Sequence, residues 1–180
     1  IIMGIARRYQ VQIVEDDPYS LLLKMPPPTL AMLDPARVIY VATMSKVLSP
    51  GLRTAYIVLP GAEMTRRITS GVRAICQAKA GLLDALVSRW IETGLATQCL
   101  RSIREELTQR HHVLRQVMGP HSQDRSPSPH VWLPLPEWWT NADFVAFARR
   151  QGLALVSSSV FAVTGHSPPA VRVALGSAPD

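Results

Sequence analysis

Three short apolar runs in the first third of the chain predict β-strands. The runs are rich in β-branched and aromatic residues and carry almost no charge, as in strands buried on both faces, and they cover residues 11–14, 37–44 and 54–59. A helix is expected before the first run, and further helices after the third. This order predicts part of an open α/β sheet, and in such sheets ligands bind at the carboxyl ends of the strands.

Helical periodicity marks the stretches on either side. The opening residues are expected to form an amphipathic helix whose apolar face carries Ile1, Ile5 and Tyr9. Residues 62–118 are predicted to be helical, with breaks near Gly81 and Gly94. An apolar stripe at helical spacing is expected to lie in the core, and it consists of Leu82, Leu83, Leu86, Trp90 and Ile91.

A second, smaller unit is expected after a loop of Ser, Pro, Gln and Asp at residues 119–129. The later sequence predicts a helix that begins near Thr140 and ends at Gly152. It also predicts strands at residues 130–136, 153–156 and 170–175. This mixture of elements is typical of a small α+β unit.

We therefore expect two domains. Residues 1–95 would be the C-terminal part of a larger domain, and residues 96–180 a small C-terminal domain that opens with a long linking helix.

Composition narrows the class of protein only slightly. The net charge of +6 and the pI near 9.9 raise the odds of an acidic partner, but the arginines are scattered over the polar faces of predicted helices, which favours a solvated surface.

Cys76 and Cys99 lack CxxC spacing, which argues against a disulfide framework or a zinc site. With no secretory signal and no apolar stretch long enough to span a bilayer, a cytoplasmic location is expected. His111 and His112 have no acid or cysteine at ligand spacing, so surface positions are favoured.

An unusual set of polar groups follows the second predicted strand. The hydroxyls of Thr43 and Ser45 precede Lys46, and a Pro-Gly turn then brings Arg53 seven residues after the lysine. The lysine is either a solvated cap or an amine held in a pocket for carbonyl chemistry. The hydroxyls and the arginine together would suit a phosphate dianion.

Three consecutive acids, Glu15, Asp16 and Asp17, follow the first predicted strand and precede Pro18 and Tyr19. Such acids are costly at a strand end unless they are solvated or paired with a cation. One interpretation is a polar loop that Pro18 ends. The other is that one acid faces a positively charged ring nitrogen.

Arg172 interrupts the last predicted strand. It alternates with the larger apolar residues Val171 and Val173, so its side chain is expected on the opposite face of the strand. An exposed edge would explain this arginine, and so would a rigidly held fork that grips a carboxylate.

The motifs taken together resemble a known family. Asp16 to Tyr19, Thr43 to Lys46 with Gly51-Leu52-Arg53, and the late Val-Arg-Val around Arg172 look like the class I/II aminotransferases, which are pyridoxal-phosphate-dependent proteins of fold-type I. A further layer of similarity lies at residues 130–136, 144–149, 161–163 and 170–176. It resembles the MocR-type branch of the GntR transcription regulators, in which an aminotransferase-like domain follows a DNA-binding winged helix.

The resemblance implies a role for each site residue. Lys46 would form a Schiff base with pyridoxal 5'-phosphate, Asp16 would pair with the pyridinium nitrogen, and Tyr19 would bond the ring 3-oxygen. Thr43, Ser45 and Arg53 would hold the phosphate. Arg172 would bind the carboxylate of an amino-acid substrate or effector. The implied fold is the end of the large-domain α/β sheet plus a small α+β domain, and the implied assembly is a homodimer.

The resemblance also implies what else the pocket needs. The family's glycine-rich phosphate loop, stacking aromatic and ring asparagine belong to sequence before Ile1, so we expect a fragment cut at both ends that binds the cofactor weakly or not at all by itself. Ala55 departs from the glycine that the family often has there. Three functions stay open: the effector domain of a regulator that reaches DNA through its N-terminal part, a freestanding amino-acid transaminase, and a remnant without function.

Overall fold

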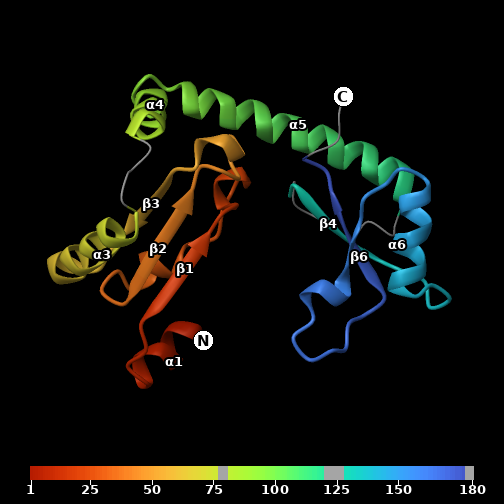
Figure 1. Ribbon diagram of the computed structural model, residues 1–180, viewed down its shortest axis with the longest axis horizontal. Helices are drawn as coiled ribbons and strands as arrows, with labels where there is room; N and C mark the ends of the chain where they lie inside the picture. The colour runs from red at the N-terminus through yellow and green to blue at the C-terminus, as the bar shows by residue number, and fades with distance from the viewer. Residues whose placement is uncertain (77–80, 120–127, 177–180) are drawn as a thin grey trace. The chain divides into compact units, whose positions relative to one another are not determined.

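The computed structural model describes residues 1–76, 81–119 and 128–176 (Figure 1). The chain forms two compact units, Ile1–Ile103 and Arg104–Asp180. Each unit has its own three-stranded sheet.

The first unit contains most of the helices. In chain order its elements are α1 (Ile2–Arg8), β1 (Ile13–Asp17), η1 (Ser20–Leu22), α2 (Leu30–Leu33), β2 (Val38–Thr43), η2 (Pro50–Leu52), β3 (Ala55–Val58), α3 (Gly61–Ile75), α4 (Gly81–Glu92) and the start of α5 (Leu95–Met118). The expected opening helix and the expected helix breaks near Gly81 and Gly94 are confirmed.

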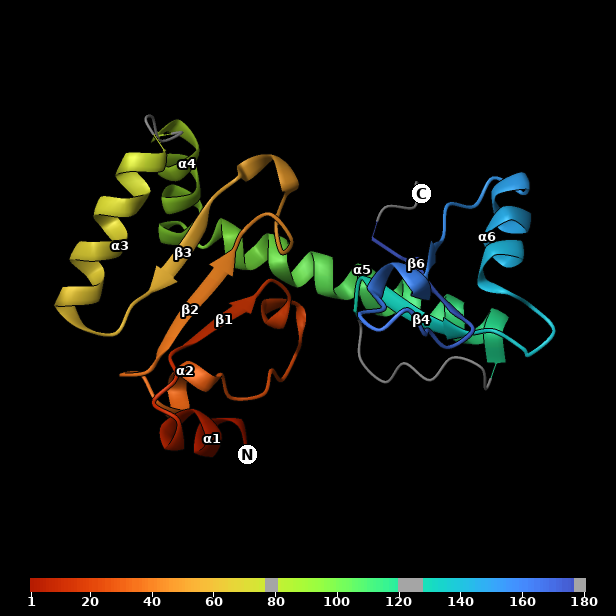
Figure 2. The same ribbon diagram turned by 60° about the horizontal axis from the view of Figure 1, so that its bottom comes forward.

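The first sheet has the order β1-β2-β3, with the strands side by side in both views (Figures 1 and 2). Strand β1 runs parallel to β2 and places Asp16 opposite Val41. Strand β3 runs antiparallel to β2 and places Ala55 opposite Thr43. The carboxyl ends of β1 and β2 and the start of β3 therefore meet at one edge of the sheet, as the open-sheet prediction requires.

The predicted burial of these strands is wrong in large part. Val38 is the fully buried residue of β2, whereas every residue of β3 is exposed and Val14 in β1 is 64% exposed. Strand β3 lies at the edge of the described sheet, so it has a neighbouring strand on one side only. The sequence pattern indicates correctly that these strands are apolar, but no described residue covers the exposed side chains of β3 or Val14 of β1.

Two helices differ from the prediction in the same way. Ile5 and Tyr9 of the opening helix region are exposed, and the side chains that α1 buries are Met3 and Ala6. In α4 the buried residue is Val87, whereas the predicted core stripe includes exposed side chains at Leu82, Leu86 and Ile91.

The second unit is the predicted α+β arrangement. After α5 its elements are β4 (His130–Pro134), α6 (Asn141–Arg150), β5 (Val156–Ser157), η4 (Ser158–Phe161) and β6 (Ala170–Ala174). The sheet is antiparallel in the order β4-β6-β5, and α6 packs on β5 and β6. The strand predicted at 153–156 is instead two residues long and begins at its last position. Most of the loop predicted at 119–129 lies outside the described residues.

The prediction of a surface position is wrong for His111. Its side chain is buried on α5, with Nε2 2.6 Å from the carbonyl oxygen of Ser128, whereas His112 is exposed. That hydrogen bond compensates for burial of the ring nitrogen. On the same helix, Nη1 of Arg110 donates to the carbonyl oxygen of Leu175 at 2.7 Å. Polar side chains of α5 therefore bond the residues that precede β4 and follow β6 in the second sheet.

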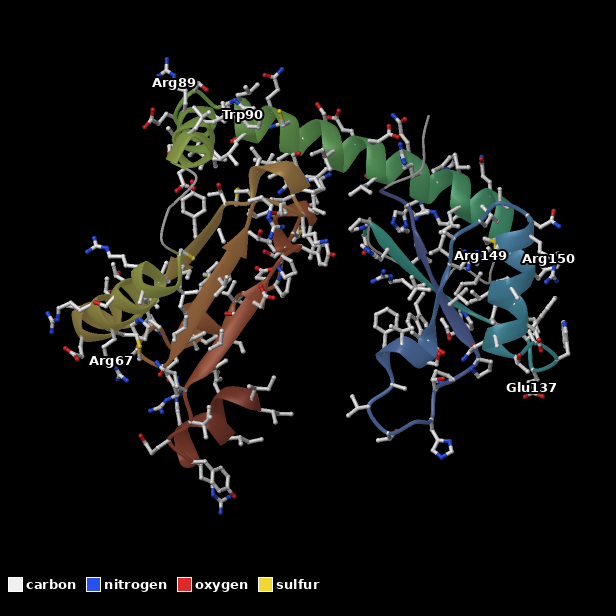
Figure 3. The ribbon with its side chains drawn as sticks, viewed as in Figure 1. Arg67, Arg89, Trp90, Glu137, Arg149 and Arg150 are labelled. Atoms are coloured by element: carbon white, nitrogen blue, oxygen red, sulfur yellow. The ribbon has the colours of Figure 1, made fainter. Side chains whose placement is uncertain are left out.

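The prediction of solvated arginines is confirmed at several positions on the described helices, but not at Arg110 of α5, which is half-buried. Arg67 on α3, Arg89 on α4, and Arg149 and Arg150 on α6 are exposed (Figure 3). None of the described helices combines the length and the apolar character that crossing a membrane would require.

Candidate functional site

A cavity of about 380 Å³ lies at the edge where β1 and β2 end. Its lining consists of Asp16, Pro18, Tyr19, Thr43, Ser45, Lys46, Arg53, Thr54 and Ala55. All six residues that the sequence assigns to a cofactor are among them. The fold brings them together because the parallel pairing of β1 and β2 aligns two segments that lie about 25 residues apart in the sequence.

The three acids of β1 are strand residues, not a polar loop, and they have different surroundings. Glu15 accepts hydrogen bonds from the backbone N–H groups of Leu30 at 2.9 Å and Ala31 at 3.0 Å, and so caps the start of α2. Asp16, on the opposite face of the strand, lines the cavity. Within the described residues, the side chain of Asp16 has no hydrogen bond or ion pair, so its carboxylate is available to a ligand.

Asp17 is the most heavily bonded of the three acids. Its carboxyl accepts from the phenol of Tyr40 at 2.8 Å, from the backbone N–H of Ser20 at 2.9 Å, from the Ser20 hydroxyl, and from the backbone N–H of Tyr19. Burial raises the pKa of this carboxyl, but the hydrogen bonds outweigh burial and leave the pKa below its usual value. For Tyr40, burial and then the hydrogen bond to Asp17 raise the pKa of the phenol.

The loop between β2 and β3 carries Lys46. The loop is closed at its base by a hydrogen bond from the N–H of Met44 to the carbonyl oxygen of Thr54 at 2.9 Å. Met44, Val47 and Leu52 are buried beneath it, whereas Lys46 is exposed. The amine of Lys46 has no hydrogen bond or ion pair with any residue that the structure describes. A lysine fixed at its backbone with a free amine is suited to attack a carbonyl group.

Two hydroxyl residues, Thr43 and Ser45, line the cavity at this edge. The Oγ1 atom of Thr43 accepts a hydrogen bond from the N–H of Ser45 at 3.2 Å, which leaves the hydroxyl hydrogen of Thr43 for a ligand. The hydroxyl of Ser45 also lines the cavity. Two hydroxyls beside two cations form a site suited to a phosphate group.

Arg53 has an unusual backbone. Its φ of 49° and ψ of 24° place it in the left-handed region, which is costly for a residue with a Cβ. Such conformations occur at functional sites where the surrounding structure maintains them. The Arg53 guanidinium lines the cavity and has no ion pair among the described residues. Together, Lys46 and Arg53 outnumber Asp16 in charge, so the cavity favours an anionic ligand.

Thr54 and Pro18 line the cavity but were not predicted as site residues. The Thr54 side chain is buried, with Oγ1 3.0 Å from the carbonyl oxygen of Leu52 and 3.1 Å from Oδ1 of Asp84 on α4. This contact ties α4 to the residue after Arg53. Its partner lies 30 residues away, so no local sequence signal could have identified Thr54.

Arg172 lies in the second unit, on the central strand β6, opposite Trp132 and Val156. The alternative of an exposed edge is therefore wrong. The guanidinium carbon lies 5.2 Å from the ring centroid of Phe161, and the Nε atom is buried without a partner in the described structure. A held guanidinium with an unmet donor is suited to a carboxylate ligand.

Sequence comparison finds regulators and aminotransferases, although no protein-family model matches the chain. The chain is 32% identical over 178 residues to YdeF, an HTH-type transcriptional regulator of Bacillus subtilis, and the match covers 97% of this chain and 38% of that relative. It is 32% identical over 119 residues to the mitochondrial kynurenine/alpha-aminoadipate aminotransferase of Rattus norvegicus, covering 63% of this chain and 28% of that enzyme.

Structural comparison finds aminotransferases across nearly the whole chain. The multiple substrate aminotransferase of Thermococcus profundus matches with a TM-score of 0.83 at 23% identity, covering 99% of this chain and 46% of that one. LysN, the alpha-aminoadipate aminotransferase of Thermus thermophilus, solved with N-(5'-phosphopyridoxyl)-L-leucine, matches with a TM-score of 0.81 at 23% identity, covering 97% and 48%. The chain thus spans less than half the length of these proteins.

Proposed function

We propose that the chain is a pyridoxal-phosphate-binding, aminotransferase-like domain of a MocR/GntR-type transcription regulator. It has part of the fold of the fold-type I aminotransferases, and HTH-type transcription regulators are among its relatives. It holds the cofactor by a Schiff base and senses or processes an amino acid by transaldimination.

The observation that carries the proposal is that one cavity, at the ends of β1 and β2, is lined by all of the residues that the sequence assigns to the cofactor. Its lining includes Lys46, Asp16, Tyr19 and Arg53, together with the hydroxyl residues Thr43 and Ser45, from separate parts of the chain. The amine matches the aldehyde of pyridoxal phosphate, the carboxylate the ring nitrogen and the phenol the ring 3-oxygen, and the hydroxyls and the guanidinium together match the phosphate dianion. The donor set therefore fits this cofactor.

The ring end of the site belongs to Asp16, Tyr19 and Lys46. When bound, the cofactor supplies an aldehyde for Schiff-base chemistry and a ring that accepts electrons. Asp16, whose carboxylate has no other partner among the described residues, would pair with the pyridine nitrogen, and its negative charge would favour a proton on that nitrogen. Tyr19 bonds the ring 3-oxygen. Lys46 would supply the amine that links to the aldehyde, and with its side chain free the same amine could accept or donate a proton.

The phosphate end belongs to Thr43, Ser45 and Arg53. The hydroxyls donate hydrogen bonds, and the guanidinium balances the negative charge. Arg172 of the second unit is assigned the carboxylate of the amino acid, because its guanidinium is held over Phe161 and still has a donor to offer.

The regulator is favoured over a freestanding transaminase because the match that covers 97% of the chain is to an HTH-type regulator. In this proposal the full-length protein is a cytoplasmic homodimer and reaches DNA through a domain outside these residues. The transaminase stays the second candidate, since the rat aminotransferase is equally identical over its shorter match. Both candidates need the same cavity.

The test uses the full-length protein with pyridoxal phosphate and borohydride. We expect reduction to attach the cofactor to Lys46 irreversibly, so that a peptide containing Lys46 carries the added mass. The Lys46→Ala variant should carry none, while a Lys24→Ala variant, which removes an exposed lysine away from the cavity, should match the wild type. Labelling that persists in Lys46→Ala would contradict the proposal.

A second assay separates the two candidates. The cofactor-loaded protein is mixed with an amino acid and a 2-oxo acid. Sustained conversion of the pair would favour the transaminase, and a spectral change without turnover would favour the regulator.

A further inference from the structure

A hydrogen-bonded cluster lies behind the cavity and lines none of it. Asp17, Ser20 and Tyr40 form this cluster, and none of the three is among the lining residues. Strand β2 supplies Tyr40, whose phenol reaches Oδ2 of Asp17 at 2.8 Å. The start of η1 supplies Ser20, whose N–H reaches Oδ1 at 2.9 Å and whose hydroxyl reaches Oδ2.

The cluster fixes the backbone on which two cavity residues stand. Asp17 follows Asp16 directly, and its carboxyl accepts from the backbone N–H groups of Tyr19 and Ser20, so its side chain reaches across Pro18 to the residues that follow. Tyr19 is also the N-cap residue that directly precedes η1. The turn from the strand into η1 is thereby closed by a side chain, and the closed turn holds the backbone from which the Tyr19 side chain extends.

We propose that Asp17, bonded to Tyr40 and Ser20, is a positioning residue that holds Asp16 and Tyr19 against the cofactor ring. The inference rests on the proposed function, because it concerns the same cavity. The link from β2 matters most, since Tyr40 joins the turn after β1 to the strand that leads into Lys46. This link thus keeps Asp16 and Tyr19 at a fixed position relative to Lys46.

The geometry separates positioning from direct contact. The carboxyl of Asp17 is occupied by donors from Tyr19, Ser20 and Tyr40, so it has little capacity left for a ligand. Its effect must pass through the residues that it holds. Loss of a single donor should shift the position of the Tyr19 phenol without removing any group from the cavity.

The experiment compares Tyr40→Phe with the wild type in the full-length, cofactor-loaded protein. Removing the phenol oxygen alone takes one charge-assisted hydrogen bond from Asp17. We expect the Kd for pyridoxal phosphate to rise roughly threefold to tenfold. We also expect the pH midpoint of the bound cofactor's absorbance change to move, because the phenol that bonds the ring 3-oxygen is displaced.

The matched control is Tyr56→Phe. Tyr56 lies on β3 of the same sheet and is 40% exposed, and its phenol has no hydrogen bond among the described residues. It should keep both the wild-type Kd and the wild-type pH midpoint. Ser20→Ala removes a different donor to Asp17. It should shift the Kd and the pH midpoint in the same direction as Tyr40→Phe does, and it replaces Tyr40→Phe in the test if that variant does not fold.

The outcomes are distinct. If the wild type binds the cofactor and both cluster variants keep its Kd and pH midpoint, the positioning role is overturned, even if their melting temperature falls. If the wild type itself shows no cofactor absorbance, the proposed function fails and this inference fails with it. A shifted midpoint in both cluster variants, with the Tyr56→Phe control unchanged, supports the positioning role.

Discussion

Asp16 and Asp17 are neighbours in β1, yet their carboxyl groups have separate tasks on opposite faces of the strand. Asp16 lines the cavity, whereas Asp17 accepts hydrogen bonds from Tyr40 and Ser20. The alternation of side chains along a strand produces this division. Substitutions at adjacent positions should therefore affect ligand binding and stability differently.

Asp16→Asn should weaken cofactor binding and leave stability unchanged. The variant loses the negative charge that pairs with the ring nitrogen, and we expect the Kd for pyridoxal phosphate to rise about tenfold. The free energy of unfolding should change by less than about 0.5 kcal/mol, because Asp16 has no partner in the described fold. Equilibrium dialysis and urea unfolding of the full-length protein measure the two effects. An unaltered Kd would argue against a ring contact.

Glu15→Ala should have the reverse effect. The carboxylate of Glu15 accepts from Leu30 and Ala31 at the start of α2, so its removal leaves two backbone donors unsatisfied. We expect a loss of about 1–2 kcal/mol in unfolding free energy and less than a twofold change in cofactor Kd.

The control for Glu15→Ala is Glu63→Ala. Glu63 forms an exposed ion pair with Arg66 on α3, and such pairs contribute about 0–1 kcal/mol. Equal destabilisation by the two substitutions would show that Glu15 does not cap α2 in solution.

The hydrogen bonds to Asp17 predict a limit to stability in acid. The pKa of Asp17 is lowered by folding, so its stabilisation is complete above the ordinary aspartate value of about 4 and disappears as the pH falls through the lowered pKa. The pKa of Tyr40 is raised, so its donor hydrogen remains in place up to pH values above about 10. Urea unfolding from neutral pH down to about pH 2 should show a shallower decline in Asp17→Asn than in the wild type.

Arg53 allows its backbone and its charge to be tested separately. Arg53→Gly and Arg53→Ala both remove the guanidinium, and both should raise the cofactor Kd about tenfold. The glycine variant should be about 1 kcal/mol more stable than the alanine variant, because the φ of 49° is costly only for a residue with a Cβ. Denaturant unfolding compares the pair, and equal stabilities would place Arg53 outside the left-handed region in solution.

Arg172→Lys should affect the amino acid and not the cofactor. A lysine cannot reproduce the planar fork over the Phe161 ring, so we expect amino-acid affinity to fall by about tenfold or more. Cofactor absorbance titrated with amino acid gives this affinity. The control is Arg149→Lys on the exposed face of α6, which should match the wild type. A similar loss in both variants would remove Arg172 from the carboxylate site.

The cavity could be predicted from the sequence because its signals are local. One apolar run ends at Val14, just before the acids, and another leads into Thr43, and parallel pairing of the two strands suffices to bring the Lys46 loop beside Asp16. The sequence could not show that the three acids have different hydrogen-bond partners. Leu30 lies 15 residues from Glu15, which it bonds, and Tyr40 lies 23 residues from Asp17.

Burial was the property that the sequence predicted least well. The pattern of apolar residues in β3 indicates a preference for a dry environment, but it carries no information on what covers the strand. The same applies to His111. Its polarity predicts a surface position, but the hydrogen bond to the carbonyl oxygen of Ser128 compensates for burial of its ring.

Strand β3 has a practical consequence for handling these 180 residues by themselves. It stands at the edge of its sheet with all four residues exposed, and Ile57 and Val58 are two of them. An apolar edge strand offers its open backbone groups as a template for a strand of another molecule. We therefore expect the isolated polypeptide to self-associate as its concentration rises. A lysine in place of Ile57 should delay precipitation, because charge on an edge strand opposes intermolecular pairing.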